Sequence, residues 1–286
     1  MFSISKESAL AAASTSLFVL LWSSGAIFSK WGLAHASPFA FLLIRFAIAL
    51  CALVLLIPLM KFKLPRSART IGYALATGVV LLGAYQIFYL LALDLKVTPG
   101  VMATLMGVQP ILTAVIIERR HSWSRLFGLV LGLSGLILVV YQGIGLAGMS
   151  WFGMLFAVLA LFSMTLGTLM QKRITENPLG TLPLQYLAGL LMCAVFVPFQ
   201  PFHFEHSSGF VLPVLWMGLV VSVLATLLLY RMIAQGNLVN VTSLFYLVPA
   251  VTAIMDYLIF GNKLAALSLL GMVLIIIGLM FVFRKA

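Results

Sequence analysis

The sequence predicts an all-α integral membrane protein with ten transmembrane helices, arranged as two five-helix repeats of inverted topology. Three observations predict this fold: the composition, the distribution of basic residues, and a motif that occurs twice. Hydrophobic residues make up 63% of the 286 residues and charged residues only 8%, whereas soluble domains carry about 25% charged residues. A soluble chain of this size could not bury so much apolar surface, so we predict a multi-pass membrane protein.

Ten apolar segments are long enough to cross a hydrocarbon layer of about 30 Å as helices, at about 1.5 Å per residue. They span residues 9–32, 38–60, 70–93, 98–117, 125–141, 151–172, 181–199, 211–233, 240–259 and 265–283. Short connections join them, and the longest runs from Gln200 to Gly209. The chain therefore has no soluble domain between its predicted helices.

The Lys and Arg residues test both the number of helices and their orientation. With ten helices and a cytoplasmic N-terminus, 13 of the 17 basic residues fall on the cytoplasmic side, and three (Lys30, Lys96 and Lys263) fall on the outer side. Arg45 is left inside the second segment. This bias satisfies the positive-inside rule and predicts that both termini are cytoplasmic. It also explains the net charge of +11 without a nucleic-acid partner.

A proline motif occurs twice, once in the fourth apolar segment and once in the ninth. Val108-Gln109-Pro110-Ile111-Leu112-Thr113 returns as Leu247-Val248-Pro249-Ala250-Val251-Thr252. Proline inside a helix removes a backbone hydrogen bond, and in lipid neighbouring groups must satisfy the freed carbonyl. We therefore predict that Pro110 and Pro249 break their helices or serve as hinges.

A second doubled pattern predicts where the two repeats lie. Gly128-x6-Gly135 in the fifth segment matches Gly271-x6-Gly278 in the tenth. We predict one repeat in residues 1–145 and the other in residues 146–286. Because each contains an odd number of helices, the second repeat enters the membrane from the opposite side, which makes the repeats inverted.

The order of several motifs resembles the EamA-type branch of the drug/metabolite transporter superfamily, over essentially the whole chain. The motifs are Leu20-Leu21-Trp22-Ser23-Ser24-Gly25, Leu43-Ile44-Arg45-Phe46, Ala103-Thr104-Leu105 leading to Gln109-Pro110, Ser243-Leu244 leading to Val248-Pro249, and the glycine-punctuated fifth and tenth segments. The resemblance implies ten helices in two inverted halves around a central cavity. It also implies export of amino acids, other metabolites or toxic compounds.

The sequence departs from that family at one place. Members commonly carry a Gly-Glu pair after the fourth and ninth helices. Glu118 fills the first of these positions, whereas the second reads Gly261-Asn262. A mechanism that needs this carboxylate in both halves is therefore in doubt, while the fold is not.

Aromatic and uncharged polar side chains within the apolar segments are the candidate cavity residues. In lipid such groups must face protein or water, and their alternative role is to hold neighbouring helices together. We predict a substrate-binding surface formed by Trp22, Ser24, Tyr85, Gln86, Tyr89, Gln109, Thr113, Tyr230, Tyr246 and Thr252.

Three charged residues in the half of the layer predicted to face outward are candidates for gating: Lys30, Arg45 and Asp256. An ionisable group at the centre of a transmembrane helix costs roughly 2.5–3.5 kcal/mol on insertion scales. We predict that these residues pair or gate the cavity. The alternative is that Arg45 extends outward to the surface, while Asp256 reaches the headgroups or Lys263.

The remaining features predict structural roles. Gly128 and Gly132 form a Gly-x3-Gly pattern that favours close helix packing, either inside the bundle or in a dimer, so we expect a monomer or weak homodimer. Cys51 and Cys193 lie far apart in apolar segments and are predicted to be small core residues. The four histidines form no cluster typical of a metal site, and we predict neither a metal nor another cofactor.

We therefore expect a secondary transporter that exports amino acids or related small metabolites across the cytoplasmic (inner) membrane by alternating access. Its partners would be a small-molecule substrate and membrane lipid. Asp256 is the only acid well inside a segment, which favours facilitated or weakly coupled transport. Efflux of multidrug cations is one alternative, but it would need a deep carboxylate, and Asp256 is shallow. Exchange of sugar phosphates or nucleotide sugars is another, but it would need several converging basic residues, and only Arg45 and Lys30 could serve.

An enzyme would need a nucleophile and base, or a metal cluster, within the segments, and the sequence shows neither.

Overall fold

The computed structural model describes residues 6–60, 63–117, 123–141, 149–175, 179–235 and 247–283. For residues 6–15 and several others, among them Pro110 and Pro249, it describes the backbone only. Within the described ranges the secondary structure is helical, and the one β-type contact is an isolated antiparallel bridge between Ala36 and Phe204. The prediction of an all-α fold is confirmed for this part of the chain.

Seventeen helical elements follow one another along the described residues. They are α1 (Lys6–Leu33), α2 (Pro38–Met60), α3 (Ala68–Gly78), η1 (Val79–Ala84), α4 (Tyr85–Asp94), α5 (Pro99–Met106), α6 (Gln109–Ile117), α7 (Trp123–Tyr141), α8 (Trp151–Lys172), η3 (Leu179–Thr181), α9 (Leu182–Phe196), η4 (Val197–Phe199), α10 (Ser208–Leu215), η5 (Trp216–Ala225), α11 (Thr226–Gln235), α13 (Leu247–Phe260) and α14 (Ala266–Phe283).

Six described segments are long and apolar enough to cross a membrane, judged by length and composition: Ser16–Leu33, Pro38–Leu59, Ala68–Asp94, Trp151–Lys172, Leu179–Phe199 and Ser208–Met232. They match six of the ten predicted segments. The other four contain α5 with α6, α7, α13 and α14. The count of ten membrane crossings therefore stays a prediction, whereas a multi-pass arrangement of apolar helices is established.

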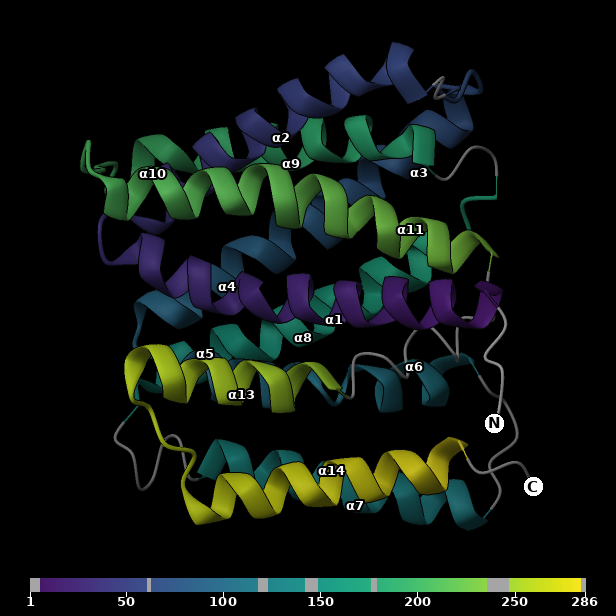
Figure 1. The fold of residues 1–286 in the computed structure, drawn as a ribbon, viewed down its shortest axis with the longest axis vertical. Helices are drawn as coiled ribbons and strands as arrows, with labels where there is room; N and C mark the ends of the chain where they lie inside the picture. Colours follow the sequence, from purple (N-terminus) through teal and green to yellow (C-terminus); the bar gives the residue numbers. More distant parts are fainter. Residues whose placement is uncertain are drawn as a thin grey trace.

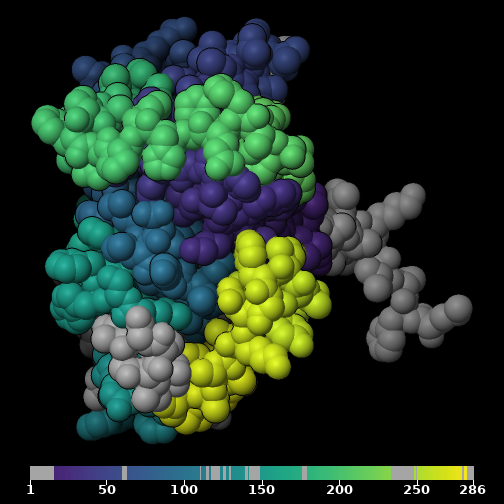
Figure 2. Space-filling model, turned by 90° about the vertical axis from the view of Figure 1, so that its left-hand side faces the viewer, coloured from purple at the N-terminus to yellow at the C-terminus, as the bar shows by residue number. Residues whose placement is uncertain are grey.

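The helices lie roughly side by side in a stack (Figure 1). α2 and α9 pack together at one end of the stack, and α7 packs along α14 at the other. Between these pairs, α4 contacts α8, α1 contacts α13, and α13 contacts α5. Figure 2 shows the green surface around α10 beside the purple surface of α1, which in turn borders the yellow surface of α13. Elements from the two ends of the sequence are thus interleaved.

Two of the long helices contain a π-helical stretch. η1 lies between α3 and α4, and η5 lies between α10 and α11, in both cases without a change of direction. The Thr226 hydroxyl donates to the carbonyl of Val221 at 3.0 Å, five residues earlier, and so binds within the widened turn. π-Helical turns are rare in proteins, and a large share of those that do occur lie at functional sites.

The fourth predicted segment is broken, but the break precedes the proline that predicted it. α5 ends at Met106, Gly107 and Val108 form a turn, and Pro110 is the second residue of α6. The first turn of a helix has no intrahelical acceptor for its N–H groups, so proline is tolerated there. Pro249 is likewise the third residue of α13, and the residues immediately before that helix lie outside the described ranges.

Glycines bring α7 and α14 into backbone contact. A Cβ atom on Gly135 would overlap the carbonyl oxygen of Gly271, and one on Gly278 would lie 2.5 Å from the carbonyl oxygen of Gly128. A Cβ atom on Gly132 would overlap the side chain of Ile111 in α6. Gly128 and Gly132 therefore make contacts within the bundle, which is the first of the two roles predicted for them.

At the end of the bundle where α1 meets α2, two connections are joined by a contact that we call the clasp, formed by residues 35–37 and 203–205. The Glu205 N–H donates to the carbonyl of His35 at 2.9 Å, and the Ser37 N–H donates to the carbonyl of His203 at 2.9 Å. The His35 Nδ1 and Glu205 Oε2 atoms lie 2.6 Å apart. The clasp thus ties the α1–α2 connection to the segment that leads into α10.

Candidate functional site

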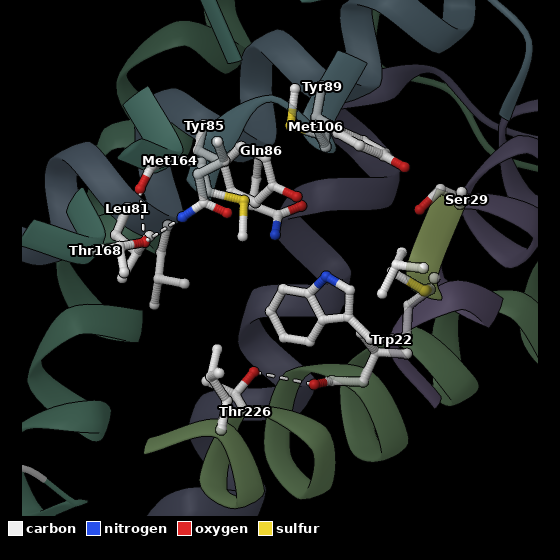
Figure 3. A pocket seen from close by; sticks show the side chains of 18 of the residues that line it. Trp22, Ser29, Leu81, Tyr85, Gln86, Tyr89, Met106, Met164, Thr168 and Thr226 are labelled. Carbon is white, nitrogen blue, oxygen red and sulfur yellow. Dashed lines mark hydrogen bonds between the residues drawn. The ribbon is translucent and has the colours of Figure 1, made fainter. Parts of the chain in front are cut away.

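A cavity lies among the helices in the middle of the stack, and its empty space, counted together with the open solvent at its mouth, is about 1170 Å³. Figure 3 shows several of its lining side chains directed toward a common space. The described lining residues are Trp22, Gly25, Ala26, Ser29, Arg45, Leu81, Leu82, Tyr85, Gln86, Tyr89, Ala103, Met106, Gly107, Gln109, Met164, Thr168, Gln171, Tyr186, Met217, Val221, Thr226, Leu229, Tyr230, Val248 and Thr252. Both sequence halves contribute, as expected of a ligand site between helices.

Large aromatic side chains form much of the cavity wall. Trp22 of α1 projects into the middle of the view in Figure 3. The rings of Tyr85 and Tyr89, one turn apart on α4, meet edge to face with their centroids 5.6 Å apart. Tyr186 and Tyr230 line the wall from α9 and α11 and are fully buried. Such rings offer broad apolar faces with polar hydroxyl groups at their tips.

Arg45 provides the positive charge of this wall. It lies about two turns into α2, and its side chain is only 2% exposed. Its Nε donates to the Ser222 hydroxyl at 2.8 Å, and its Nη1 donates to the Gln86 amide oxygen at 3.0 Å. These bonds hold the guanidinium between η5 and α4, so the side chain does not extend to the surface as the alternative prediction required.

A second polar cluster joins α8, α9 and α11 around the buried Gln185. Its amide nitrogen donates to the Gln171 side-chain oxygen at 2.6 Å, and its amide oxygen accepts a hydrogen bond from the Tyr230 hydroxyl. The neighbouring Tyr186 hydroxyl donates to the Ser222 carbonyl at 2.8 Å. The amides and hydroxyls of this cluster are thus paired, as an apolar environment demands.

A third polar contact crosses from α6 to α8. The Gln109 amide nitrogen donates to the Thr168 hydroxyl at 3.1 Å, and that hydroxyl donates to the Met164 carbonyl at 2.7 Å. Gln109 is the first residue of α6, directly after the broken turn. The break therefore places an amide side chain at the cavity wall.

Eight of the residues singled out by the sequence line this cavity: Trp22, Arg45, Tyr85, Gln86, Tyr89, Gln109, Tyr230 and Thr252. Ser24 is not among the described lining residues. Its hydroxyl instead donates to the Leu21 carbonyl at 2.7 Å and accepts from Trp216 Nε1 at 2.9 Å. Thr113 is buried away from it and donates to the Gln109 carbonyl at 2.9 Å. Tyr246 lies outside the described residues.

The other two charged candidates, Lys30 and Asp256, do not line the cavity and bind other groups of the protein. The Lys30 ammonium donates to the Leu93 carbonyl at 2.8 Å, close to the end of α4, where cations are favoured. The Asp256 carboxylate accepts from the Gly100 N–H at 2.9 Å and from the Asn262 amide at 2.9 Å. Asp256 thus joins α13 to the first turn of α5 beside the cavity.

Several lining residues were not predicted: Ser29, Thr168, Gln171 and Tyr186. The spacing on α1 contained the signal for Ser29, since Trp22, Gly25, Ala26 and Ser29 follow the i, i+3, i+4, i+7 pattern of one helix face. Among the described residues no group of three or more His, Cys, Asp or Glu side chains could hold a metal ion.

Apolar membrane-spanning helices around a polar and aromatic cavity define the class of membrane transporters that bind a small solute between helices. Comparison with known protein families identifies the family within this class. The model of the EamA-like transporter family matches residues 10–141 and again residues 151–284. The chain therefore belongs to the EamA-like transporter family, within the drug/metabolite transporter superfamily, as its motifs suggested.

Two curated proteins of Bacillus subtilis (strain 168) are similar over nearly the whole chain. The uncharacterized transporter YdfC is 26% identical over 280 residues, covering 95% of this chain and 90% of YdfC. The uncharacterized transporter YvbV is 24% identical over 286 residues, covering 94% of this chain and 90% of YvbV. A protein of known crystal structure is similar in fold, with a TM-score of 0.71 over 97% of this chain and 99% of that protein's chain. The two sequences are 18% identical, so this likeness supports the fold alone.

Proposed function

We propose that this protein is a secondary transporter that exports amino acids or related small metabolites across the cytoplasmic membrane by alternating access. The observation that carries the proposal is the central cavity, which has aromatic walls and a few fixed polar groups and is lined from both halves of the sequence. A cavity at the interface of two halves can be exposed to either side in turn when the halves move against each other.

The proposed architecture is ten helices in two inverted repeats, residues 1–145 and 146–286. Close contacts at an offset of 140 residues support it. A Cβ atom on Gly78, before η1, would lie 2.5 Å from the Cα of Gln185 on α9. A Cβ atom on Gly218, in η5, would lie 3.4 Å from the carbonyl oxygen of Arg45 on α2. Each π-containing helix thus rests on the equivalent position of the opposite half.

The repeated family match and the pairing of equivalent helices also support this duplication. The family model matches the chain twice, at 10–141 and 151–284. α5, which is the first part of the fourth predicted segment, packs against α13 of the ninth, and α7 of the fifth packs against α14 of the tenth, so equivalent segments of the two halves meet. An axis that relates the halves would pass through such pairs and through the cavity between them.

The proposed orientation places both termini in the cytoplasm and the clasp outside. The start of α1 and the end of α14 lie at the same side of the bundle in Figure 1, which agrees with an even number of crossings. The bias of basic residues supplies the direction. Among the described residues that line the cavity there is no acid, which favours facilitated or weakly coupled transport over strong proton coupling.

Two other substrate classes are alternatives. Multidrug cations would meet the positive charge of Arg45 with no described lining carboxylate to offset it. Sugar phosphates or nucleotide sugars carry two or more negative charges, whereas Arg45 is the one basic residue in the described part of the lining. Both classes therefore fit the cavity less well than a small solute of low net charge.

Uptake by proteoliposomes that contain the purified protein tests the proposal. We expect saturable uptake of one or more labelled amino acids above that of protein-free liposomes, changed little by a pH gradient. Uptake of lipophilic cations without uptake of any amino acid would contradict the substrate class. A strict requirement for a pH gradient would contradict facilitated transport while leaving the transporter assignment in place.

A further inference from the structure

Arg45 is a buried cation without a described counter-ion at the wall of a ligand cavity. The acidic side chains that the structure describes are Asp94, Glu205 and Asp256, and none of them pairs with Arg45 or lines the cavity. A buried charge without a partner is unfavourable in a low-dielectric environment. The hydrogen bonds described for Arg45 engage two of its five N–H donors, through Ser222 and Gln86.

A second polar group in the cavity also lacks a described partner. The Ser29 side chain is fully buried, and its hydroxyl has no hydrogen-bond partner among the described atoms. It lines the cavity, and Figure 3 shows its hydroxyl directed toward the open space. Buried hydroxyls are generally paired in native proteins, so the Ser29 hydroxyl is a second group at the wall with unused hydrogen-bonding capacity.

Aromatic and thioether side chains form much of the rest of the wall, which suits a bulky apolar ligand. Trp22, Tyr85 and Tyr89 present ring faces and edges, and Met106 and Met164 add flexible thioether side chains. Aromatic rings favour stacked or edge-to-face contact with a second ring, and methionine adapts to irregular apolar shapes.

We propose that the transported substrate is an organic monocarboxylate with an aromatic or similarly bulky apolar body, and that Arg45 binds its carboxylate. The proposal rests on the transport function proposed above and narrows its substrate class. A carboxylate fits the planar fork of a guanidinium and forms charge-assisted hydrogen bonds with it. Ser222 and Gln86 fix the guanidinium, so its orientation is set before the substrate arrives.

The amino group of an amino acid is not what this site recognises. The described lining holds no carboxylate to pair with an ammonium group, and Arg45 repels a substrate whose only charge is positive. A carboxylate without an amino group should therefore bind at least as well as the corresponding amino acid. This distinguishes the proposal from simple recognition of zwitterions.

Three compounds of nearly equal size separate these possibilities: phenylalanine, 3-phenylpropanoate and phenylalaninamide. We expect the two carboxylates to bind and to be taken up, and the amide to bind at least about tenfold more weakly, because it loses a charge-assisted hydrogen bond. Binding is measured with the purified protein in detergent by isothermal titration calorimetry. Uptake is measured in proteoliposomes. Amide binding as tight as that of phenylalanine would overturn the proposal.

Two substitutions place this selectivity at Arg45. Arg45→Gln should reduce the preference for carboxylate over amide to within about twofold, whereas Arg45→Lys should keep part of it because the charge remains. Lys30→Gln is the matched control, since Lys30 is a partly buried cation near the end of α1 that does not line the cavity. It should keep the wild-type preference. If Arg45→Gln does not fold, the wild-type comparison of the three compounds decides alone.

The two assays separate this proposal from the transport function on which it rests. Carboxylate-selective binding without uptake would support Arg45 as the carboxylate site and contradict transport of these compounds. Uptake that does not distinguish acid from amide would support transport and overturn the carboxylate site. Unchanged selectivity in a folded Arg45→Gln protein would overturn the role of Arg45.

Discussion

At the scale of single residues, the cavity combines a largely apolar wall with a few polar groups that are fixed by neighbours. Ser222 is central to this arrangement because it binds two of them. Its hydroxyl accepts from Arg45, and its carbonyl accepts from Tyr186, both at 2.8 Å. Both contacts fall within the π-helical η5. Movement of η5 would therefore move the guanidinium and the tyrosine hydroxyl together.

Gln109 offers a direct test of a polar cavity residue. Gln109→Leu removes the hydrogen bond to Thr168 and the buried amide at the cavity wall. A neutral hydrogen bond from this amide to the bound substrate would contribute about 0.5–1.5 kcal/mol, so on the proposal that Gln109 binds substrate, the uptake rate at low substrate concentration should fall roughly twofold to tenfold. Initial uptake rates in proteoliposomes, normalised to the amount of reconstituted protein, measure the change.

Thr113→Val is the matched control for Gln109→Leu. Thr113 lies one turn further along α6, is buried, and binds only the Gln109 carbonyl among its described partners. It does not line the cavity, so its substitution should leave most of the uptake. Equal losses in both variants would show that the effect of Gln109 arises from helix packing.

The sequence located polar and aromatic residues inside apolar segments but could not fully assign their faces. On a helix surrounded by lipid, both the lipid side and the core side are apolar, so hydrophobic periodicity marks neither. Ser24 and Ser29 illustrate this limit. They are five residues apart and lie on different faces of α1, and only Ser29 shares the face of Trp22. Ser24 instead binds Trp216.

At the scale of elements, local chemistry predicted the broken segment but not the π-helical stretches. Proline marked the break because its missing N–H restricts where it can sit in a helix. A π stretch has no comparable residue signal, since it arises from how a long helix fits its neighbours. The close approach of Gly78 to Gln185 shows such a fit at the start of η1.

The contact between α7 and α14 predicts a large effect of one methyl group. In Gly278→Ala, the new Cβ would lie 2.5 Å from the Gly128 carbonyl oxygen and 2.8 Å from the Gly132 nitrogen. These are backbone atoms that cannot move aside easily, so overpacking should destabilise the protein by roughly 1–3 kcal/mol. The thermal midpoint in detergent, followed by tryptophan fluorescence or size-exclusion chromatography, should fall.

Gly72→Ala is the control for this substitution. A Cβ atom at Gly72 in α3 would meet nothing within 4 Å. Because alanine has a higher helix propensity than glycine, this change should keep or raise the thermal midpoint. A midpoint for Gly278→Ala equal to that of the wild type would contradict the close packing of α7 and α14.

At the scale of the whole molecule, the composition and the order of motifs established a multi-pass transporter before any contact was known. They could not establish which contacts tie the two proposed repeats together, because those contacts depend on tertiary geometry. The clasp is an example. Its residues lie in connections that carry little pattern of their own, yet the clasp joins residues 35–37 to residues 203–205 across the proposed halves.

Under the proposed alternating access, the clasp would be a moving contact. If the halves separate at this end to expose the cavity, the α1–α2 connection must part from the segment before α10. Ala36 and Phe204 are opposed in the bridge and exchange no hydrogen bond with each other. In such a pair the Cα atoms are about 4.5 Å apart, a separation that a disulfide can span. We therefore expect the variant Ala36→Cys with Phe204→Cys to form a disulfide on oxidation.

The oxidised double variant should lose most of its uptake, and reduction with dithiothreitol should restore it. Cys51→Ser is the suitable background, since Cys51 is exposed and Cys193 is buried. Each single cysteine variant controls for the loss of the native side chain, including the ring contact between Phe204 and Phe210. Substrate binding should persist in the oxidised form, because the clasp lies outside the described cavity lining. Full uptake with a disulfide proven by mass spectrometry would mean that the halves do not separate here, and alternating access through this end would be wrong.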